Sequence, residues 1–251
     1  MLKTEKSKNV TVKCLLVIIA LLIIPFQTLA VQNCMDASQL GPVYYMQPNQ
    51  VDLISVVGPP PAPSSPQGEA DLRAVLAAQR ARTLAEIDEA AADSCLSIFR
   101  FNEAIGPGFK PANLPFTIVF LQRVFDDGMR GIAAAKQTFN RPRPFVADKQ
   151  ITPSVAQSAN ASYPSGTATF AYMTAILLAN MLPEKALAIF DRASSISQSR
   201  VIAGVHYPSD LDAGRIAAAV IDNVLLHDAA FETDLAKSRI EVRHAAGVLS
   251  P

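Results

Sequence analysis

The residues SRVIAGVHYPSD hold a histidine and a carboxylate at a spacing that suits nucleophilic chemistry. Arg200 lies six residues before His206, and Asp210 lies four residues after it. If a helix begins at Pro208, Asp210 falls in its first turn, where its carboxylate can accept the Nδ1–H of His206. This leaves Nε2 with a free lone pair, as a histidine nucleophile requires. A His and an Asp that merely cap a helix are the alternative for this cluster alone.

The segment KQTFNRPRPF holds two cations seven residues apart. Lys136 is expected at the end of a helix, and Arg143 lies between two prolines, which make its backbone extended and stiff. A lysine offers a phosphate a point charge, and an arginine offers paired planar donors. Basic residues near a helix C-terminus also commonly cap the helix dipole or face solvent, so this segment alone does not establish a site.

The segment SYPSGT has the pattern of an anion-binding helix start. Ser162 can cap a helix that begins at Pro164. The N–H groups of Ser165, Gly166 and Thr167 then have no partner within the helix and can bind an anion. Gly166 permits close approach, and Ser165 adds a hydroxyl. An ordinary capped helix start is the alternative.

Together the three clusters provide the parts of a phosphoryl transfer site. Such a site needs several cations and N–H donors around one anion, and here also a nucleophile with an orienting acid. All of these occur within residues 136–210. His227 and His244 have no polar partners nearby in the sequence, and we expect them to be surface or structural residues.

The elements that would position these clusters are helices. Apolar side chains at helical spacing between residues 71 and 101 predict one long helix or two. Alternating β-branched patterns are scarce, and further helices are expected at about 116–136, 164–181, 183–203, 208–226 and 229–245. We therefore predict an all-α fold, a single-domain helical bundle with its polar site between helices.

Two N-terminal segments are expected to lie outside the bundle. Residues 1–30 carry four lysines, an apolar run of about 12 residues and a small residue before the expected cut, which is typical of a cleaved secretory signal. A retained membrane anchor is the alternative, although a bilayer span needs about 20 residues. Residues 31–69 include GPPPAPSSPQG and predict an extended, proline-rich arm before a domain at 70–251.

Charge and cysteine content narrow the class of protein. Without residues 1–30 the chain has 18 basic and 21 acidic side chains, which predicts no surface for nucleic acid. Cys34 and Cys95 are then the only cysteines. In an oxidising compartment they could form a disulfide between the arm and the first helix, and two free buried thiols are the alternative.

The combined pattern resembles the three-part signature of the type-2 phosphatidic acid phosphatase superfamily, which is shared with vanadium haloperoxidases. The matching residues are Lys136-x6-Arg143-Pro144, Pro164-Ser165-Gly166 and Ser199-Arg200-x5-His206-x3-Asp210. Within this superfamily the chain is most similar to the bacterial class A non-specific acid phosphatases. The likeness covers nearly all of the chain after the signal segment.

The resemblance implies a mechanism and a setting. His206 would attack phosphorus to form a phosphohistidine, and Asp210 would orient it. The phosphoryl oxygens would be held by Lys136, Arg143, Ser165, Gly166 and Arg200. Members of the family are all-α, require no metal ion or other cofactor, act on small phosphorylated molecules and often form homo-oligomers in the periplasm. No stable membrane association is expected once the signal is removed.

The sequence departs from the family at Thr167. The family's second motif reads Pro-Ser-Gly-His, and that histidine protonates the leaving group, whereas a threonine hydroxyl is far too weak an acid to do so. Loss of a general acid costs ~10²–10⁴-fold with a poor leaving group. We therefore expect a phosphatase that favours good leaving groups or takes its proton elsewhere. The alternatives are a degenerate phosphate-binding protein with little turnover, a phosphotransferase, and a vanadate-dependent peroxidase.

Overall fold

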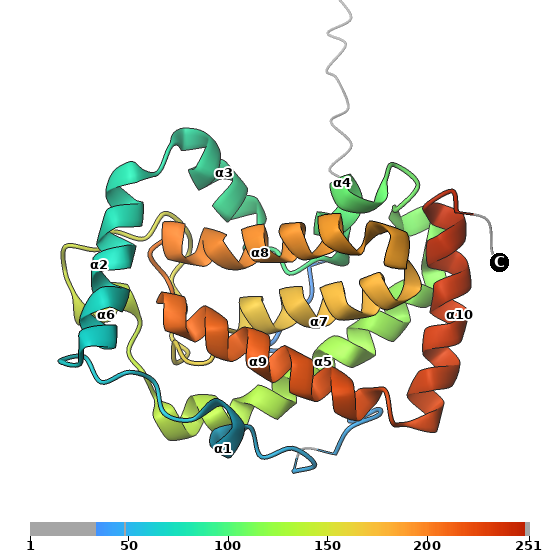
Figure 1. The fold of residues 1–251 in the computed structure, drawn as a ribbon, viewed down its shortest axis with the longest axis horizontal. Helices are drawn as coiled ribbons and strands as arrows, with labels where there is room; N and C mark the ends of the chain where they lie inside the picture. The colour runs from blue at the N-terminus through green and yellow to red at the C-terminus, as the bar shows by residue number, and fades with distance from the viewer. Residues whose placement is uncertain (1–33, 48, 249–251) are drawn as a thin grey trace, which may run out of the picture. The chain divides into compact units, whose positions relative to one another are not determined.

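The computed structural model describes residues 34–47 and 49–248, so the signal expected at 1–30 lies outside the described residues. Every regular element in the described ranges is a helix, which confirms the all-α prediction. At the centre, α7 (Gly166–Met181) packs between α8 (Ala186–Ile202) and α9 (Pro208–Leu225) (Figure 1). Helix α7 is apolar on all sides, as expected of a helix enclosed by others.

Two further helices complete the bundle. Helix α5 (Pro115–Phe139) packs against α7, α9 and α10 (Ala229–Ala245), and α10 crosses the end of the central helices (Figure 1). Glu241 of α10 accepts hydrogen bonds from the N–H groups of Phe116 and Thr117 at 3.1 and 2.8 Å. A carboxylate thus satisfies the free donors at the N-terminus of α5. The helix ends at Phe139, three residues later than the sequence predicted, and Asn140 follows it in the left-handed conformation.

The predicted helical region at 71–101 is divided. Helix α2 (Pro66–Ala81) ends before Thr83, which begins α3 (Leu84–Ala92) with a capping box formed with Glu86. The remaining short elements are α1 (Leu53–Val57), η1 (Ile98–Phe101), α4 (Asn102–Ile105), η2 (Pro111–Asn113), α6 (Pro144–Ala147) and η3 (Pro183–Lys185). Helix α2 packs on α8 and α9, at the end opposite α10 (Figure 1).

The region expected as an extended arm, 31–69, includes α1 and the first turn of α2. Ser65 caps α2, so this helix begins at Pro66, four residues before the domain boundary expected at 70. The arm is fixed to α5 chiefly by the buried carboxylate of Asp127, which accepts hydrogen bonds from the N–H groups of Tyr44, Tyr45 and Met46 at 3.0, 2.7 and 3.1 Å. The neighbouring Asp126 accepts the N–H of Gly41 at 3.1 Å. The arm is thereby held against α5.

A disulfide joins Cys34 of the arm to Cys95, which follows α3. Of the two alternatives left open by the sequence, the structure therefore has the disulfide and not the two free thiols. Next to it, the N–H of Met35 donates to the carbonyl of Leu96 at 2.7 Å. Within residues 34–47 and 49–248, no helix combines the length and the apolar character that a membrane crossing requires.

Candidate active site

The three sequence clusters meet at one cavity of about 270 Å³. Its wall includes six of the predicted site residues, namely Lys136, Arg143, Gly166, Thr167, Arg200 and His206. They come from the end of α5, the segment before α6, the start of α7, the end of α8 and the loop before α9. Two predicted residues, Asp210 and Ser165, do not line the cavity: Asp210 bonds to His206 of its wall, and the N–H of Ser165 bonds to the carbonyl of Asp210.

A tight turn after α8 places His206. Gly204 has a φ of +76°, a conformation that favours glycine, and it lets the chain reverse at the end of the helix. The N–H groups of Val205 and His206 then donate to the carbonyl of Arg200 at 3.1 and 3.3 Å. Helix α9 begins at Pro208, as predicted, so Asp210 lies in its first turn.

The hydrogen bonds of His206 fix its tautomer. Its Nδ1 lies 3.2 Å from Oδ2 of Asp210, and its Nε2 lies 3.1 Å from Nη1 of Arg143. A guanidinium only donates, so Nε2 accepts and Nδ1 carries the proton. Burial, aided by the charges of Arg143 and Lys136, lowers the pKa of His206 to about 4, against the opposing effect of Asp210. The imidazole is therefore neutral above about pH 4, with the Nε2 lone pair toward the cations.

Asp210 is buried and surrounded by donors. Arg141 donates to Oδ1 at 2.7 Å, and the Ser162 hydroxyl and the Tyr207 N–H both donate to Oδ2. Burial alone would raise the pKa of Asp210, but its bond to His206 and the charge of Arg141 lower it below the usual value. The carboxylate thus stays charged and keeps the His206 ring oriented.

Arg141 is a residue of this site that the sequence reasoning missed. It spans Asp210 and Asp71 of α2, to which it donates at 2.9 Å, and its guanidinium lies 4.0 Å from the centre of the Tyr207 ring. The signal was present, because Arg141 shares the proline-stiffened segment of Arg143. The two arginines thus bind the two members of the His–Asp pair. Arg143 donates a hydrogen bond to His206, and Arg141 donates one to Asp210.

The start of α7 differs from the prediction. The helix begins at Gly166 with Ser165 as its cap, so the expectation of a Ser162 cap and a start at Pro164 is wrong. The physical reason is that the Ser162 hydroxyl is engaged by Asp210, whereas Ser165 Oγ accepts the N–H of Ala168 at 3.2 Å.

The donors at this helix start differ accordingly. The Ser165 N–H is not free, because it donates to the carbonyl of Asp210 at 2.9 Å, and the Ser165 side chain does not line the cavity. Within the described ranges, the N–H groups of Gly166 and Thr167 have no hydrogen-bond partner. These two donors, rather than three, therefore remain for an anion.

Each of the three cations is anchored by only part of its donor set. Lys136 Nζ donates to the carbonyl of Ala161 at 2.9 Å. Arg143 donates to the carbonyls of Asn160 and Val205 at 2.8 and 2.9 Å. The anchors of Arg200 are the Ser94 and Ser199 hydroxyls and the Ala90 carbonyl. All of these anchors are uncharged.

The cavity wall holds cations without an acidic side chain. Burial, with the nearby charge of Arg143, lowers the pKa of Lys136 to about 7 and that of Arg200 to about 10. Buried charges are costly unless they are paired, and no Asp or Glu is among the residues that line this cavity. The arrangement therefore favours a bound anion.

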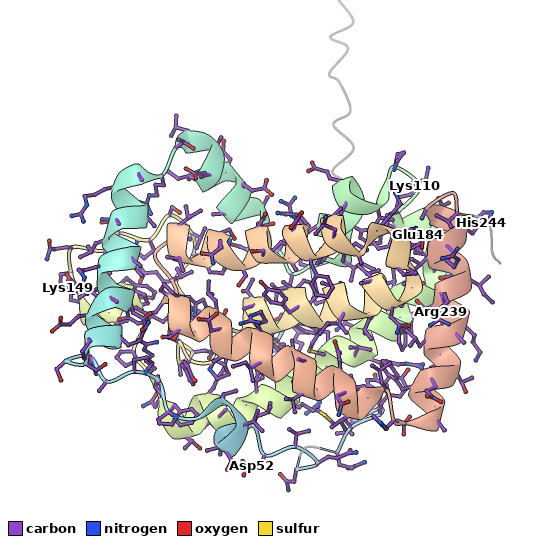
Figure 2. The ribbon with its side chains drawn as sticks, viewed as in Figure 1. Asp52, Lys110, Lys149, Glu184, Arg239 and His244 are labelled. Carbon is purple, nitrogen blue, oxygen red and sulfur yellow. A yellow bond between two sulfur atoms is a disulfide. The ribbon has the colours of Figure 1, made fainter. Side chains whose placement is uncertain are left out.

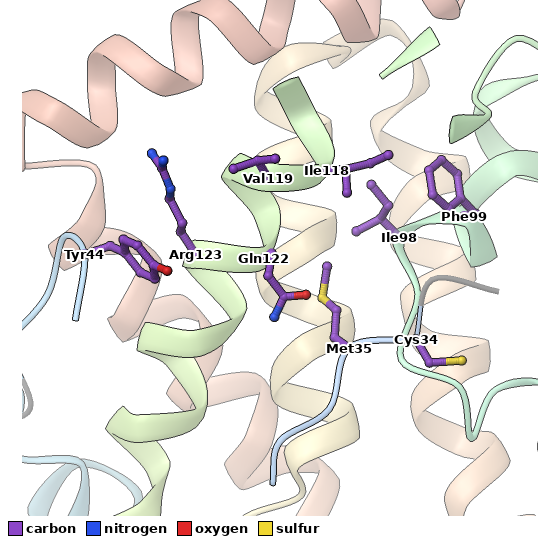
Figure 3. Close-up of a pocket in the computed structure, with 9 residues that line it drawn as sticks. All are labelled: Cys34, Met35, Tyr44, Ile98, Phe99, Ile118, Val119, Gln122 and Arg123. Atoms are coloured by element: carbon purple, nitrogen blue, oxygen red, sulfur yellow. The ribbon is translucent and has the colours of Figure 1, made fainter. Parts of the chain in front are cut away.

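A larger cavity of about 530 Å³ lies elsewhere, between the arm, η1 and α5 (Figure 3). Its lining includes Met35, Ile98 and Ile118 with Arg123 at one side, and none of the predicted site residues. Size alone therefore does not mark the reactive site. Nor do residues 34–47 and 49–248 contain a group of three or more His, Cys, Asp or Glu side chains that could hold a metal ion.

The remaining histidines lie away from this chemistry. His227 and His244 are exposed, and His244 lies on α10 at the far end of the molecule from α2 (Figure 2). His227 follows the end of α9, and its Nδ1 bonds to the carbonyl of Asn223 of that helix. Neither can take the place of the histidine that is absent at position 167.

Comparison with known proteins agrees with this geometry. Residues 116–234 match the model of the PAP2 superfamily. A non-specific acid phosphatase of Salmonella typhi is 30% identical over 90% of this chain and 93% of its own length. That of Salmonella typhimurium is 32% identical over 76% and 80%, and that of Providencia stuartii 29% identical over 82% and 87%. The chain belongs to the PAP2 superfamily and, within it, to the bacterial class A non-specific acid phosphatases.

Proposed function

We propose that this phosphomonoester hydrolase acts through a phosphohistidine formed at His206. The observation that carries the proposal is the direction of Nε2, which faces a cavity lined by the buried Arg143 and Arg200, the partly buried Lys136 and no carboxylate. A phosphoryl group drawn in by these cations would displace Arg143 from the Nε2 lone pair and present its phosphorus to it.

The surrounding groups have distinct parts in the first step. Lys136, Arg143 and Arg200 balance the charge of the phosphoryl oxygens, and the N–H groups of Gly166 and Thr167 hold them at the positive end of α7. Asp210 stabilises the positive charge that develops on His206 as its Nε2 bonds to phosphorus. Water then attacks the phosphohistidine and releases inorganic phosphate.

Substrate breadth follows from where the contacts are. The charged groups of the cavity grip the phosphoryl group itself, so many leaving groups are tolerated. Because Thr167 cannot protonate a leaving oxygen, aryl phosphates and phosphoanhydrides should be better substrates than alkyl phosphates. Residues 1–30 and the disulfide support export to the periplasm after cleavage of the signal, and the substrate is a small phosphorylated molecule.

The test is a substrate series with a single replacement. Purified protein lacking residues 1–30 is assayed with p-nitrophenyl phosphate, pyrophosphate and an alkyl phosphate, with and without His206→Ala. We expect turnover of the activated substrates, a weaker rate on the alkyl ester, and loss of activity of about 10⁴-fold or more in the variant, since its nucleophile is gone.

Two controls separate this mechanism from its competitors. Rapid quenching with labelled p-nitrophenyl phosphate should trap a phosphoenzyme that is stable in alkali and labile in acid, as a phosphoramidate is. Full activity of His206→Ala would contradict the proposal. Tight phosphate binding without turnover would instead indicate a binding protein, and transfer to an added alcohol in preference to water would indicate a phosphotransferase.

A further inference from the structure

Thr167 leaves the proposed reaction without an evident proton donor for the leaving group. The residues that line the cavity include only four side chains that carry or accept a proton in the acid-to-neutral range or are charged there, namely Lys136, Arg143, Arg200 and His206. His206 is the nucleophile, and a guanidinium does not give up its proton in proteins. By elimination, Lys136 is the lining side chain able to deliver a proton.

The position of Lys136 is consistent with delivery of a proton to the leaving group. Its Cε lies 4.0 Å from the point that a Cβ on Gly166 would occupy, so it lies beside the start of α7, next to Thr167. Among the residues that the structure describes, its Nζ bonds only to the Ala161 carbonyl, and an ammonium has three donors, so two protons remain available. The side chain therefore lines the same cavity as position 167, where the family's histidine would be.

A second cavity shares part of its wall, including Lys136, with the first. It measures about 300 Å³. It shares Lys136, Met129, Asn160 and Ala37 with the cavity of about 270 Å³ described above, which is called the phosphoryl cavity from here on. Neither His206 nor the two arginines line it. In an in-line displacement the leaving group departs on the side opposite the nucleophile. A leaving group directed into the second cavity would pass Lys136 at the junction of the two spaces.

We propose that Lys136 is the general acid of this enzyme and protonates the leaving group in place of the histidine absent at position 167. This inference rests on the proposed phosphohistidine mechanism. The low pKa of Lys136, about 7, supports it, because an ordinary lysine is too weak an acid for the task. A bound phosphoryl dianion opposes this shift, which leaves Lys136 a weaker donor than a histidine would be.

The proton balance closes over the two steps. In the first, the Nε2 lone pair of His206 forms a bond to phosphorus, the P–O bond breaks with its electron pair on the leaving oxygen, and that oxygen takes a proton from Lys136 Nζ. In the second, water attacks phosphorus and gives its proton to the neutral amine of Lys136. The P–N bond breaks, and its electron pair returns to Nε2.

The experiment compares Lys136→Arg with the wild type on leaving groups of different acidity. Arginine keeps the positive charge but cannot deliver a proton. We expect kcat/KM to fall by about 10²-fold on an alkyl phosphate and by less than about 10-fold on p-nitrophenyl phosphate. Across a series of aryl phosphates, log kcat/KM should depend more steeply on the pKa of the leaving group. Equal losses on both substrates would overturn the proposal, because they would show a purely electrostatic part for Lys136.

Matched variants make the comparison specific. Arg200→Lys alters another buried cation of the same cavity and should reduce both substrates alike. Lys149→Arg, at an exposed position that does not line the cavity, should change neither. Adding Thr167→His to Lys136→Arg should restore most of the alkyl activity, since the family's donor is then present. Failure of this rescue in a protein that still hydrolyses p-nitrophenyl phosphate would count against the proposal.

The outcomes also separate this inference from the mechanism on which it rests. Lys136→Arg should still form the phosphoenzyme from p-nitrophenyl phosphate. If the wild type forms it but does not hydrolyse an alkyl phosphate, the part assigned to Lys136 is wrong and the phosphohistidine stands. If no phosphoenzyme forms in the wild type, the phosphohistidine mechanism fails, and the inference about Lys136 fails with it.

Discussion

Helix α9 carries two buried aspartates whose surroundings are opposite. Asp210 in its first turn is 0% exposed, and Asp222 in its last turn is 1% exposed. Asp210 has four bonded partners, and its pKa is lowered. Both carboxyl oxygens of Asp222 lack a hydrogen-bond partner within the described ranges, and burial raises its pKa well above the usual value.

The difference shows that burial does not decide the charge of a carboxyl group. Asp210 lies at the positive end of the helix dipole and beside a guanidinium, so the charged form is favoured despite the loss of water. Asp222 lies near the negative end with no compensating donor, so the neutral acid is favoured. At the start of α9, hydrogen-bond donors and a cation surround the carboxylate and stabilise its charge. At the end of α9 the carboxyl group has no such partners.

Removal of the charge at Asp210 should have the largest effect. Asp210→Asn keeps the shape but cannot stabilise the charged imidazole, and it favours the wrong tautomer of His206. We expect kcat for p-nitrophenyl phosphate to fall by about 10³–10⁴-fold, by analogy with the aspartate of hydrolase triads. Circular dichroism serves as the control for folding. A loss below about 10-fold would mean that the orientation of His206 depends on other groups.

Removal of Arg141, the cationic partner of Asp210, should chiefly affect the stability of the fold. Arg141→Met leaves Asp210 and Asp71 buried without their shared cation. Breaking such a buried pair costs about 3–5 kcal/mol, which urea denaturation measures as a shift of the midpoint at unchanged slope. The double variant with Asp71→Asn removes one unpaired charge and should recover part of the loss. No change in the midpoint would mean that the two carboxylates are solvated or otherwise balanced.

The smallest effect is expected at Asp222, and it depends on pH. Its folded pKa lies above its unfolded pKa, so its contribution to stability is complete below about pH 4 and is lost as pH rises toward the folded pKa. The slope approaches about 1.4 kcal/mol per pH unit over that interval. Asp222→Asn resembles the neutral acid and should flatten the decline.

Urea midpoints measured at intervals between pH 4 and 7 test this expectation. Asn223→Gln, at an exposed position of the same helix and without a titratable side chain, is the control and should leave the slope unchanged. Parallel curves for the wild type and Asp222→Asn would show that Asp222 is charged in the folded protein.

The sequence was a good guide where local rules decide the outcome. Helical spacing predicted the bundle, and the proline at 208 predicted the start of α9 and hence the place of Asp210. The residue types of the three clusters also predicted that they form one site, because cations, free N–H donors and a histidine occur together in phosphoryl transfer sites. These features depend on residues close together in the chain.

Features that depend on distant contacts could not be predicted in the same way. The cap of α7 is Ser165 rather than Ser162, because the hydroxyl of Ser162 bonds to an aspartate 48 residues away. Arg141 was missed because its partner Asp71 lies on α2, 70 residues earlier. The sequence pattern indicates which chemical groups are available. Which of these groups come into contact depends on how the helices pack.

The disulfide between Cys34 and Cys95 bears on catalysis although neither sulfur reaches the phosphoryl cavity. Ala37, three residues after one cysteine, and Ser94 and Leu96, on either side of the other, all belong to the wall of that cavity. Ser94 also holds the guanidinium of Arg200. Reduction would release two stretches of wall together with one anchor of a cation, so we expect the full activity of the polypeptide to depend on oxidative maturation.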